Sequence, residues 1–508
     1  MTQSRRDFIK FVVAGSVMAG CPIDQTLVAA PPPEASVHGE HNEICHAVRD
    51  GQHFDRPPVS RRADVVIVGG GVSGLSAACF LQKYNFLLLE KEPHWGGNAY
   101  VEEFEGQVYG TGSAFESMDS PGTHLAAELG MKMLRVDDPD PTLVNGTWVA
   151  DTWRTGLDHL PYPAAVRRSF KTFRDAMMKI DVAARKQELD NQPFSKYTSG
   201  YARQISQWWD GYGPSNWGAR TKDTSAFVAL ETLQSIAGDR PDDRITWPGG
   251  LGAITKTLSD ILLRSHSERM MSAATVVAVE PQKNEVHITY ARDGKTETVA
   301  ARAVIMATPK FITWRLVAGI PNAQIAAMRK IRYIPYPVVN LIFDKPVYHR
   351  GYDTWCPGNT FTDFVVADWT IRNEAGYKPK YNILSCYTPL QEFERGRLLT
   401  EEGSRELAAS VLRDFQKLLP AFRTDPLEVH IYRRGHPMFM STPGNYTVTI
   451  PAARVPLERV FFGNADSAGP ESLTSGAIAA SRMGADWVEK LLEGAPRASV
   501  LRAAGALS

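Results

Sequence analysis

The stretch "ADVVIVGGGVSGLSAACFLQKYNFLLLEKE", residues 63–92, decides the fold. Residues 65–68 form a short, fully apolar and largely β-branched run, which is typical of a strand buried on both faces of a parallel sheet. Gly69, Gly71 and Gly74 follow in the spacing G-x-G-x-x-G. In such a turn the first glycine permits the tight bend, the second lets a pyrophosphate approach the backbone, and the third lets helix and strand pack closely.

The residues after the glycines complete a strand–helix–strand unit. The sequence predicts a helix over residues 72–84 and a second strand over residues 86–89, which ends at Glu90. Amides and the dipole at the start of the helix favour an anion. Glu90 follows Gly69 by 21 residues (90 − 69), close to the spacing of about 20 for an acid that holds a ribose hydroxyl. This context favours a dinucleotide site over an incidental glycine turn.

Five further stretches indicate that the dinucleotide is FAD rather than NAD. The chain contains, in this order, "EKEPHWGGNA" (90–99), "WPGGLGAI" (247–254), "AATVVAV" (273–279), "ARAVIMATPK" (301–310) and "RVFFGNADSAGPESLTSGAIAASRMGADWV" (459–488). Together they resemble the second glycine motif, the Pro-Gly-Gly helix start, the adenine-contacting strand, the closing strand and the C-terminal FAD motif of the flavin-containing amine oxidase superfamily. The resemblance extends over residues 63–492.

The resemblance implies an α/β fold, with a Rossmann-like FAD-binding domain interleaved with an α+β substrate domain that has a mixed sheet and a helical insert. FAD is expected to be non-covalent, because no cysteine falls near the C-terminal motif. The five cysteines show no metal-ligand spacing, so no metal site is predicted. The residues expected to bind FAD are Gly69, Gly71, Val72, Ser73, Gly74, Glu90, Lys91, Gly97, Asn98, Gly112, Ser113, Val276, Gly463, Asn464, Asp466, Gly476 and Ala477.

The C-terminal motif also makes sense without the resemblance. Gly476, Ala480 and Gly484 are four residues apart, so a helix over residues 474–492 places them on one face. That bare face suits close approach to something flat, and the helix N-terminus offers amides to a phosphate or a ring edge. Close packing against another element by small residues is the alternative.

The order of these motifs, taken with the resemblance, implies the domain boundaries. We expect a leader over 1–30, a linker over 31–62 and a tail over 495–508. The FAD-binding domain is expected in three parts, 63–132, 247–315 and 455–494. The substrate domain is expected in two parts, 133–246 with the helical insert, and 316–454.

Within the substrate domain, Asn145-Gly146 between apolar residues predicts a hairpin. Residues 160–237 read as helical, except "QWWDGYGPSNWG" (207–218), whose glycines and proline predict a loop. That loop either walls a substrate pocket or packs by its aromatic rings. Residues 336–348 and 429–432 read as strands of the substrate sheet.

Two residues are candidates for a role near the substrate. His436 lies in "YRRGHPM", just past a predicted strand, and a histidine is easily poised as a base at neutral pH. The alternative is a histidine that only hydrogen-bonds a loop carbonyl. Amine oxidases commonly carry a lysine on the substrate strand, and the resemblance aligns Val338 with it, which leaves Asn340 as the nearest polar residue. An aromatic residue of the family is replaced by Leu473. Both departures argue against a simple monoamine.

The chain begins with an export-like pattern, "SRRDFIK" (4–10), followed by a short apolar run. Paired Arg5 and Arg6 indicate the twin-arginine route for folded proteins, so the expected location is the periplasm or the cell surface, and the export machinery is an expected partner. Cys21 ends "VMAGC" and is either a lipid-anchored residue or incidental. The apolar run is shorter than the about 20 residues that cross a bilayer.

Equal numbers of basic and acidic residues, 56 each, argue against nucleic acid and anionic membranes as partners. A small-molecule substrate is expected, with oxygen or a periplasmic carrier as the electron acceptor. Three functions stay open: oxidation of a C–N bond of an amine or amino acid, desaturase-like or protoporphyrinogen-oxidase-like oxidation of C–C bonds, and a non-catalytic flavin-binding electron-transfer role.

Overall fold

The strand that carries the glycine motif, β2 (Val59–Val68), lies inside a seven-stranded sheet. The structure, a computed structural model, describes residues 33–39, 41–137, 140–238, 242–419, 425–496 and 499, so the predicted leader with Arg5, Arg6 and Cys21 lies outside the described residues. The sheet has the order β10 (Met270–Met271), β3 (Phe86–Leu89), β2, β13 (Lys295–Met306), β12 (Val286–Arg292), β11 (Thr275–Pro281), with β21 (Val460–Phe462) also paired to β13.

Alternate residues of β2 enter two different cores, which confirms the prediction of a strand buried on both faces. Val65 and Ile67 pack with residues of the helices α2 (Val72–Phe80), α9 (Gly252–His266) and α14 (Thr474–Leu492). Val66 and Val68 pack on the other side, with residues of β11 and β12. Such a layered arrangement follows from the two-residue period of a strand.

The segment predicted as a linker, 31–62, contains regular structure in its described part, and that prediction is wrong. β1 (Ser36–Gly39) pairs in parallel with β19 (Glu428–Arg433), and α1 (Glu43–Arg49) follows. β2 itself starts at Val59, because the long β13 continues to pair with it from Met306 back to Thr298. Long-range strand pairing holds a polar segment that has no hydrophobic period of its own.

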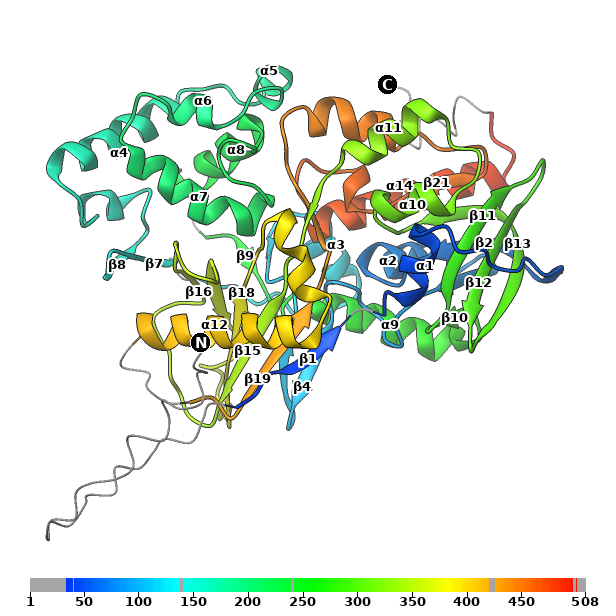
Figure 1. The fold of residues 1–508 in the computed structure, drawn as a ribbon, viewed down its shortest axis with the longest axis horizontal. Coiled ribbons are helices and arrows are strands. Elements are labelled where there is room, and N and C mark those ends of the chain that lie inside the picture. Colours follow the sequence, from blue (N-terminus) through cyan, green and yellow to red (C-terminus); the bar gives the residue numbers. More distant parts are fainter. Residues whose placement is uncertain are drawn as a thin grey trace, which may run out of the picture. The chain divides into compact units, whose positions relative to one another are not determined.

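A second, eight-stranded mixed sheet is the main sheet of the substrate domain (Figure 1). Helix α12 (Glu401–Leu418) packs on one face, where Leu407, Val411 and Phe415 share a core with Val339 and Leu341. The strand order is β1, β19, β15 (Val338–Phe343), β18 (Asn382–Tyr387), β17 (Asp363–Val366), β16 (Asp353–Trp355), β7 (Pro141–Val144), β8 (Thr147–Ala150).

The predicted hairpin at Asn145-Gly146 is confirmed. These two residues join β7 to β8 with φ values of 47° and 78°, in the left-handed region that a two-residue hairpin turn of this type requires.

The predicted loop over residues 207–218 is wrong, because these residues form most of a helix. α7 (Arg203–Trp217) contains Pro214 and ends at Gly218, whose φ is 68°. Trp209 and Trp217 are fully buried and stack with ring centroids 5.4 Å apart. Burial of these rings outweighs the low helix propensity of glycine and proline.

Helix α7 belongs to the predicted helical insert (Figure 1). The insert comprises α4 (Ala164–Met177), α5 (Lys186–Asp190), α6 (Ser195–Thr198), α7 and α8 (Ala226–Ala237). The other α-helices and strands are α3 (Pro121–Glu128), α10 (Lys310–Leu316), α11 (Asn322–Lys330), α13 (Ile450–Ala453), β4 (Val101–Phe104), β5 (Gln107–Gly110), β6 (Glu116–Ser117), β9 (Arg244–Ile245), β14 (Tyr333–Ile334) and β20 (Met438–Phe439). None of the helices in the described ranges is long and apolar enough to span a bilayer.

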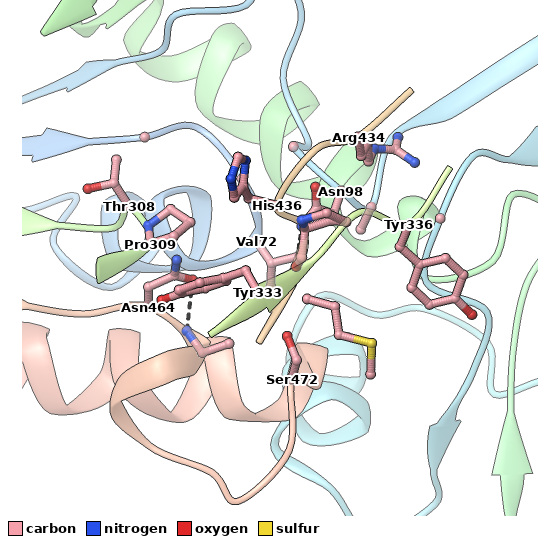
Figure 2. A pocket seen from close by; sticks show the side chains of 18 of the residues that line it. Val72, Asn98, Thr308, Pro309, Tyr333, Tyr336, Arg434, His436, Asn464 and Ser472 are labelled. Atoms are coloured by element: carbon pink, nitrogen blue, oxygen red, sulfur yellow. Dashed lines mark hydrogen bonds between the residues drawn. The ribbon is translucent and has the colours of Figure 1, made fainter. Parts of the chain in front are cut away.

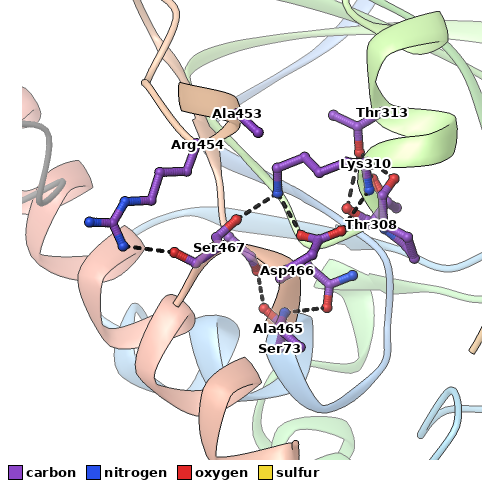
Figure 3. A network of polar contacts seen from close by, with 12 residues as sticks. Ser73, Thr308, Lys310, Thr313, Ala453, Arg454, Ala465, Asp466 and Ser467 are labelled. Atoms are coloured by element: carbon purple, nitrogen blue, oxygen red, sulfur yellow. Dashed lines mark hydrogen bonds and ion pairs between the residues drawn. The ribbon is translucent and has the colours of Figure 1, made fainter. Parts of the chain in front are cut away.

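A buried ion pair joins three distant segments at the edge of the nucleotide sheet (Figure 3). Lys310, which is 0% exposed, donates from Nζ to Asp466 Oδ1 and to Ser467 Oγ, both at 2.6 Å. The Tyr333 hydroxyl donates to Asp466 Oδ2 at 2.5 Å, and the Lys310 amide donates to the same oxygen. Three segments therefore meet at the Asp466 carboxylate: the segment after β13, the C-terminal motif and the start of the second substrate segment.

We predict that Lys310→Met lowers the free energy of unfolding by about 3–5 kcal/mol, because it leaves the Asp466 carboxylate buried without its cation. Urea denaturation followed by circular dichroism measures this loss. Lys83→Met, which breaks the exposed Lys83–Glu489 pair on the surface, is the control and is expected to leave the urea midpoint nearly unchanged. Equal midpoints for both variants would contradict the role of the ion pair.

Candidate active site

A cavity of 1280 Å³ extends from the carboxyl ends of the parallel strands to one face of the eight-stranded sheet. The residues after β2, β3 and β13 line one end, and residues of β15 to β18 line the other. Figure 2 shows part of this cavity, with Thr308 and Pro309 at one side, Val72 in the middle and Tyr336 at the other side. Ligands of open α/β sheets bind at this edge, so one elongated molecule can contact both sheets.

The three motif glycines have different reasons to lack a side chain. A Cβ at Gly69 would lie 2.9 Å from the Ala307 carbonyl oxygen, and one at Gly74 would lie 1.7 Å from the Gly69 oxygen. The fold itself therefore demands these two. A Cβ at Gly71 would have nothing closer than the Gly97 Cα at 3.7 Å, and Gly71 lines the cavity. The space in front of Gly71 fits a pyrophosphate at the N-terminus of α2.

Glu90 is buried at the end of β3, where a ribose is expected. Its carboxylate accepts from the Gly70 amide at 2.5 Å and from the Glu92 amide at 2.8 Å. Burial raises the pKa of Glu90, and Lys91 and these amides oppose that rise. Each carboxylate oxygen retains a second lone pair for a ribose hydroxyl. Val276 also lines this end of the cavity, as expected for the strand that meets the adenine.

We predict that Gly71→Leu abolishes FAD binding while the protein still folds, because the new side chain occupies the space in front of α2. The φ of Gly71 is −78°, which any residue adopts, so the backbone is not strained. The absorbance of bound flavin and the far-ultraviolet circular dichroism of the purified variant measure the two effects.

Gly74→Ala is the matched contrast for this prediction. It adds a smaller side chain, but against backbone atoms, so it is expected to reduce the yield of folded protein. A normal flavin spectrum from Gly71→Leu would contradict the nucleotide site.

The C-terminal helix α14 starts at the cavity, as predicted, but one of its first amides is already bonded. The Ser475 amide donates to Glu116 Oε1 at 2.7 Å. Burial raises the pKa of Glu116 to about 7, and hydrogen bonds from Ser120 and Ser475 oppose that rise. The bare face of the helix lies against the sheet: a Cβ at Gly484 would meet the Phe461 ring at 3.0 Å. Of the two alternatives for that face, close packing on protein is the one observed.

The small-residue loop 110–113 is held rigidly beside the substrate sheet. The Tyr387 hydroxyl donates to the Gly112 carbonyl at 2.5 Å, and the buried Arg434 guanidinium donates to the Thr111 hydroxyl at 2.6 Å. The Leu251 amide of the Pro-Gly-Gly segment donates to the Ser113 carbonyl at 3.0 Å. This loop therefore forms a fixed wall at the junction of the two sheets, where the resemblance places the flavin ring.

The substrate end of the cavity is aromatic and acidic. Tyr336, Tyr387 and Trp355 line it together with Asp353 and Asp363. Burial and the neighbouring carboxylates of Asp140 and Asp363 raise the pKa of Asp353 well above its usual range. Burial raises the pKa of Asp363 to about 7, against a hydrogen bond from Thr362. No group of three or more His, Cys, Asp and Glu side chains in the described part of the chain could hold a metal ion.

Most of the residues expected to bind FAD meet at the cavity. Gly74, Gly463 and Gly476 do not line it. Gly74 and Gly463 act by close packing instead, since a Cβ would lie 1.7 Å from the Gly69 oxygen and 3.1 Å from the Ile305 side chain, respectively. The Ser73 hydroxyl donates to the Gly463 carbonyl, which joins α2 to the end of β21. The carboxylate oxygens of Asp466 are bonded to Lys310 and Tyr333, as described above. The predicted residues that line the cavity are Gly69, Gly71, Val72, Ser73, Glu90, Lys91, Gly97, Asn98, Gly112, Ser113, Val276, Asn464, Asp466, Ala477 and His436.

Asn340 does not reach the cavity, which corrects its predicted place near the substrate. It is fully buried on β15, and its amide nitrogen donates to the Gly110 carbonyl at 3.1 Å and to the Ser385 hydroxyl at 2.7 Å. The strand β5 covers the sheet at this point. Val338, two residues earlier on the same face, does line the cavity.

His436 lines the cavity at its nucleotide half. Its ring stacks on Phe311 with centroids 4.3 Å apart, and the Asn98 side-chain amide donates to the next carbonyl, that of Pro437. Burial, followed by the charges of Arg395, His46 and Arg49, lowers the pKa of His436 to about 3. A neutral imidazole of such low basicity is a poor base at neutral pH, so the geometry favours the structural alternative.

We predict that His436 contributes a pH-dependent stability instead. The folded pKa is about 3 and the ordinary value is 6.5, so the contribution is complete above pH 6.5 and is lost as the pH falls towards 3. Between pH 7 and pH 5 this group lowers the free energy of unfolding of wild type by about 1–2 kcal/mol, and His436→Asn does not show this decrease. Denaturant titrations at pH 7 and pH 5 test this.

The same variant tests catalysis directly. Flavin reduction by His436→Asn that is slowed by about 100-fold or more would restore the role as a base.

Sequence reasoning missed the contribution of the N-terminal segment. Residues of β1 and α1, among them His38, Cys45 and Arg49, line the cavity beside the nucleotide end. The His41 amide donates to Glu92 Oε1 at 2.9 Å, and His41 Nδ1 lies 2.6 Å from Glu92 Oε2. Glu92 follows the second strand of the glycine motif. Sequence reasoning also missed Asp353 and Asp363, since only the strand register brings them to the cavity.

Comparisons with known proteins agree with this geometry. The sequence profile of the family described as "Flavin containing amine oxidoreductase" matches residues 72–488. The oxidoreductase PigB of Serratia sp. is 23% identical over 510 residues, with 83% of this chain and 74% of PigB covered. Chloroplastic protoporphyrinogen oxidase 1 of Spinacia oleracea is 25% identical over 324 residues, with 56% of each chain covered.

Solved structures share the fold. Cyclohexylamine oxidase from Brevibacterium oxydans has a TM-score of 0.66 at 17% identity, with 85% of this chain and 99% of that chain covered. Putrescine oxidase bound to putrescine has a TM-score of 0.64 at 16% identity, with the same shares covered. These likenesses confirm the expected fold class.

Proposed function

Because the chain belongs to the flavin-containing amine oxidoreductase family, we propose that it removes a hydride from the C–N bond of an amine or amino-acid-like substrate. The family makes it an FAD-dependent oxidoreductase, which sets aside a purely non-catalytic role. Bound FAD supplies the acceptor for the hydride. The non-covalent attachment expected from the sequence is part of this proposal.

One observation supports a C–N bond over a C–C bond: acidic side chains line the substrate end of the cavity. Asp353 and Asp363 are buried there among tyrosine and tryptophan rings. Buried carboxyl groups and aromatic faces both favour a cationic nitrogen. A neutral polycyclic substrate would leave the Oδ1 atom of Asp353 without a hydrogen-bond donor, at a cost that a purely apolar tunnel avoids.

The residues of this chain then have distinct tasks. The loop 110–113 and Tyr387 form a rigid wall against which the reacting carbon is positioned. Val338 and Leu473 line the cavity and present apolar side chains to the substrate. The carboxyl groups hold the charge of the substrate.

C–C oxidation remains the second candidate, and it is supported by the partial likeness to protoporphyrinogen oxidase. A substrate of this kind would contact the aromatic rings of the cavity and not the carboxyl groups. The two candidates differ in the compounds that reduce the flavin.

We predict that anaerobic addition of aliphatic amines or amino acids bleaches the flavin of the purified enzyme, and that neutral polycyclic and polyene compounds do not. Absorbance of the oxidised flavin in a stopped-flow instrument measures both panels under the same conditions. Bleaching by neutral compounds alone would overturn the proposal in favour of C–C oxidation.

We also propose export through the twin-arginine route, with Arg5 and Arg6 as the signal and the periplasm or cell surface as the destination. The support is the sequence pattern together with the cofactor: FAD is loaded in the cytoplasm, so the enzyme must leave it folded. Arg5→Lys together with Arg6→Lys is expected to retain the flavoprotein in the cytoplasm, as measured by cell fractionation. Arrival of this variant in the periplasm with flavin bound would contradict the route.

A further inference from the structure

Four side chains form a row across the substrate sheet. The strand register places Val338 opposite Tyr387, Tyr387 opposite Asp363, and Asp363 opposite Trp355. All four line the cavity. Neighbouring strands are about 4.8 Å apart, so Asp363 lies about 10 Å from Val338 along this row.

The start of the row marks where the reacting carbon is expected. The hydroxyl of Tyr387 is bonded to Gly112, in the wall of the flavin end. Val338 occupies the position that the resemblance assigns to a residue near the flavin. The acidic end of the row is therefore separated from the site of hydride removal by the width of two strand spacings.

A second carboxyl group adjoins this end. Asp353 precedes Trp355 by two residues on β16, so both side chains point to the same face. Asp353 is 2% exposed and lines the cavity, and its Oδ1 accepts no hydrogen bond from the described residues. A buried carboxyl oxygen without a donor is costly, and a ligand that donates a hydrogen bond would remove that cost.

The nearby arginine forms its ion pairs elsewhere. Arg244 binds Asp140 at 2.7 Å and Asp242 at 2.6 Å. Asp353 and Asp363 form no ion pair with a described Lys, Arg or His side chain. Arg244 lies near Asp353 but forms its ion pairs with Asp140 and Asp242, so a cationic ligand would be a further partner for the two carboxyl groups that line the cavity. The described side chains provide no cluster that would hold a metal here, so an organic cation is favoured.

Aromatic rings complete this end of the cavity. Trp355 stacks on Tyr212 with centroids 4.3 Å apart, and Tyr336 meets Tyr387 edge to face at 6.0 Å. Rings held in fixed positions beside carboxyl groups bind ammonium groups by their faces and exclude larger hydrated ions.

We propose that Asp353 and Asp363 bind a second, unreacting ammonium group of the substrate, and that the enzyme is selective for diamines or polyamines over monoamines. This inference rests on the proposed oxidation of amines. It also accounts for the absence of the lysine and the aromatic residue at Val338 and Leu473, since the distal nitrogen takes over the positioning of the substrate.

The test compares putrescine with butylamine, which has the same carbon chain and lacks the second nitrogen. Anaerobic flavin reduction by the FAD-loaded enzyme is measured for wild type, Asp353→Asn and Asp363→Asn. We expect wild type to prefer putrescine. Each variant is expected to lose about 10- to 100-fold in kcat/KM for putrescine, the range for the loss of one charged hydrogen bond. The value of kcat/KM for butylamine is expected to stay nearly unchanged. Asn keeps the shape of the side chain, and a urea midpoint confirms folding.

Asp414→Asn is the matched control. This carboxylate accepts from Thr360 on the α12 side of the sheet and does not line the cavity, so the preference for putrescine is expected to persist. Equal reduction by both amines in wild type, or an unchanged preference in both Asp353→Asn and Asp363→Asn, would overturn this inference and leave amine oxidation in place. If no amine reduces the flavin, the proposed function and this inference fail together.

Discussion

Parallel pairing of β13 with both β2 and β21 is the constraint on which the rest of the structure depends. Met306 is opposite Val68 in one pair and opposite Phe462 in the other, so three strands from distant parts of the chain end at one level. Everything that follows them, including the glycine turn, the Lys310 segment and the C-terminal motif, emerges at the same edge. The buried Lys310–Asp466 pair then fixes two of these segments to each other.

The substrate sheet is oriented by the same edge. Tyr333, whose hydroxyl is bonded to Asp466, lies just before β15, so the strand that carries Val338 starts from the nucleotide side. Tyr387 and Arg434 bind the loop 110–113 from the substrate side. The cavity is therefore continuous across both sheets, and the positions of its two ends are set by rigid strands rather than by flexible loops. Rigid strand positions favour a defined separation between two binding groups.

Local patterns explain how much of this arrangement could be predicted. The βαβ unit, the helix over 474–492 and the Asn145-Gly146 hairpin were predictable, since glycine spacing and apolar periodicity are local signals. α7 was not, because its stability comes from buried tryptophan rings that outweigh the propensity of its own residues.

The same limit applies to the site. The nucleotide residues belong to a contiguous motif, whereas Asp353 and Asp363 belong to short strands whose register is set by neighbours far along the chain. β1 was missed for a similar reason: its four residues have no apolar period, and their partner strand lies almost four hundred residues later, with Ser36 opposite His430.

The central claim is that one FAD spans the two sheets, with its adenosine near Val276 and its ring against the row that begins at Val338. A crystal structure of the FAD-loaded enzyme tests it most directly. We expect the pyrophosphate over Gly71 and the flavin ring against the wall that the loop 110–113 and Tyr387 form together. Density for the ring outside this cavity, or turned away from Val338 and Tyr387, would contradict the account.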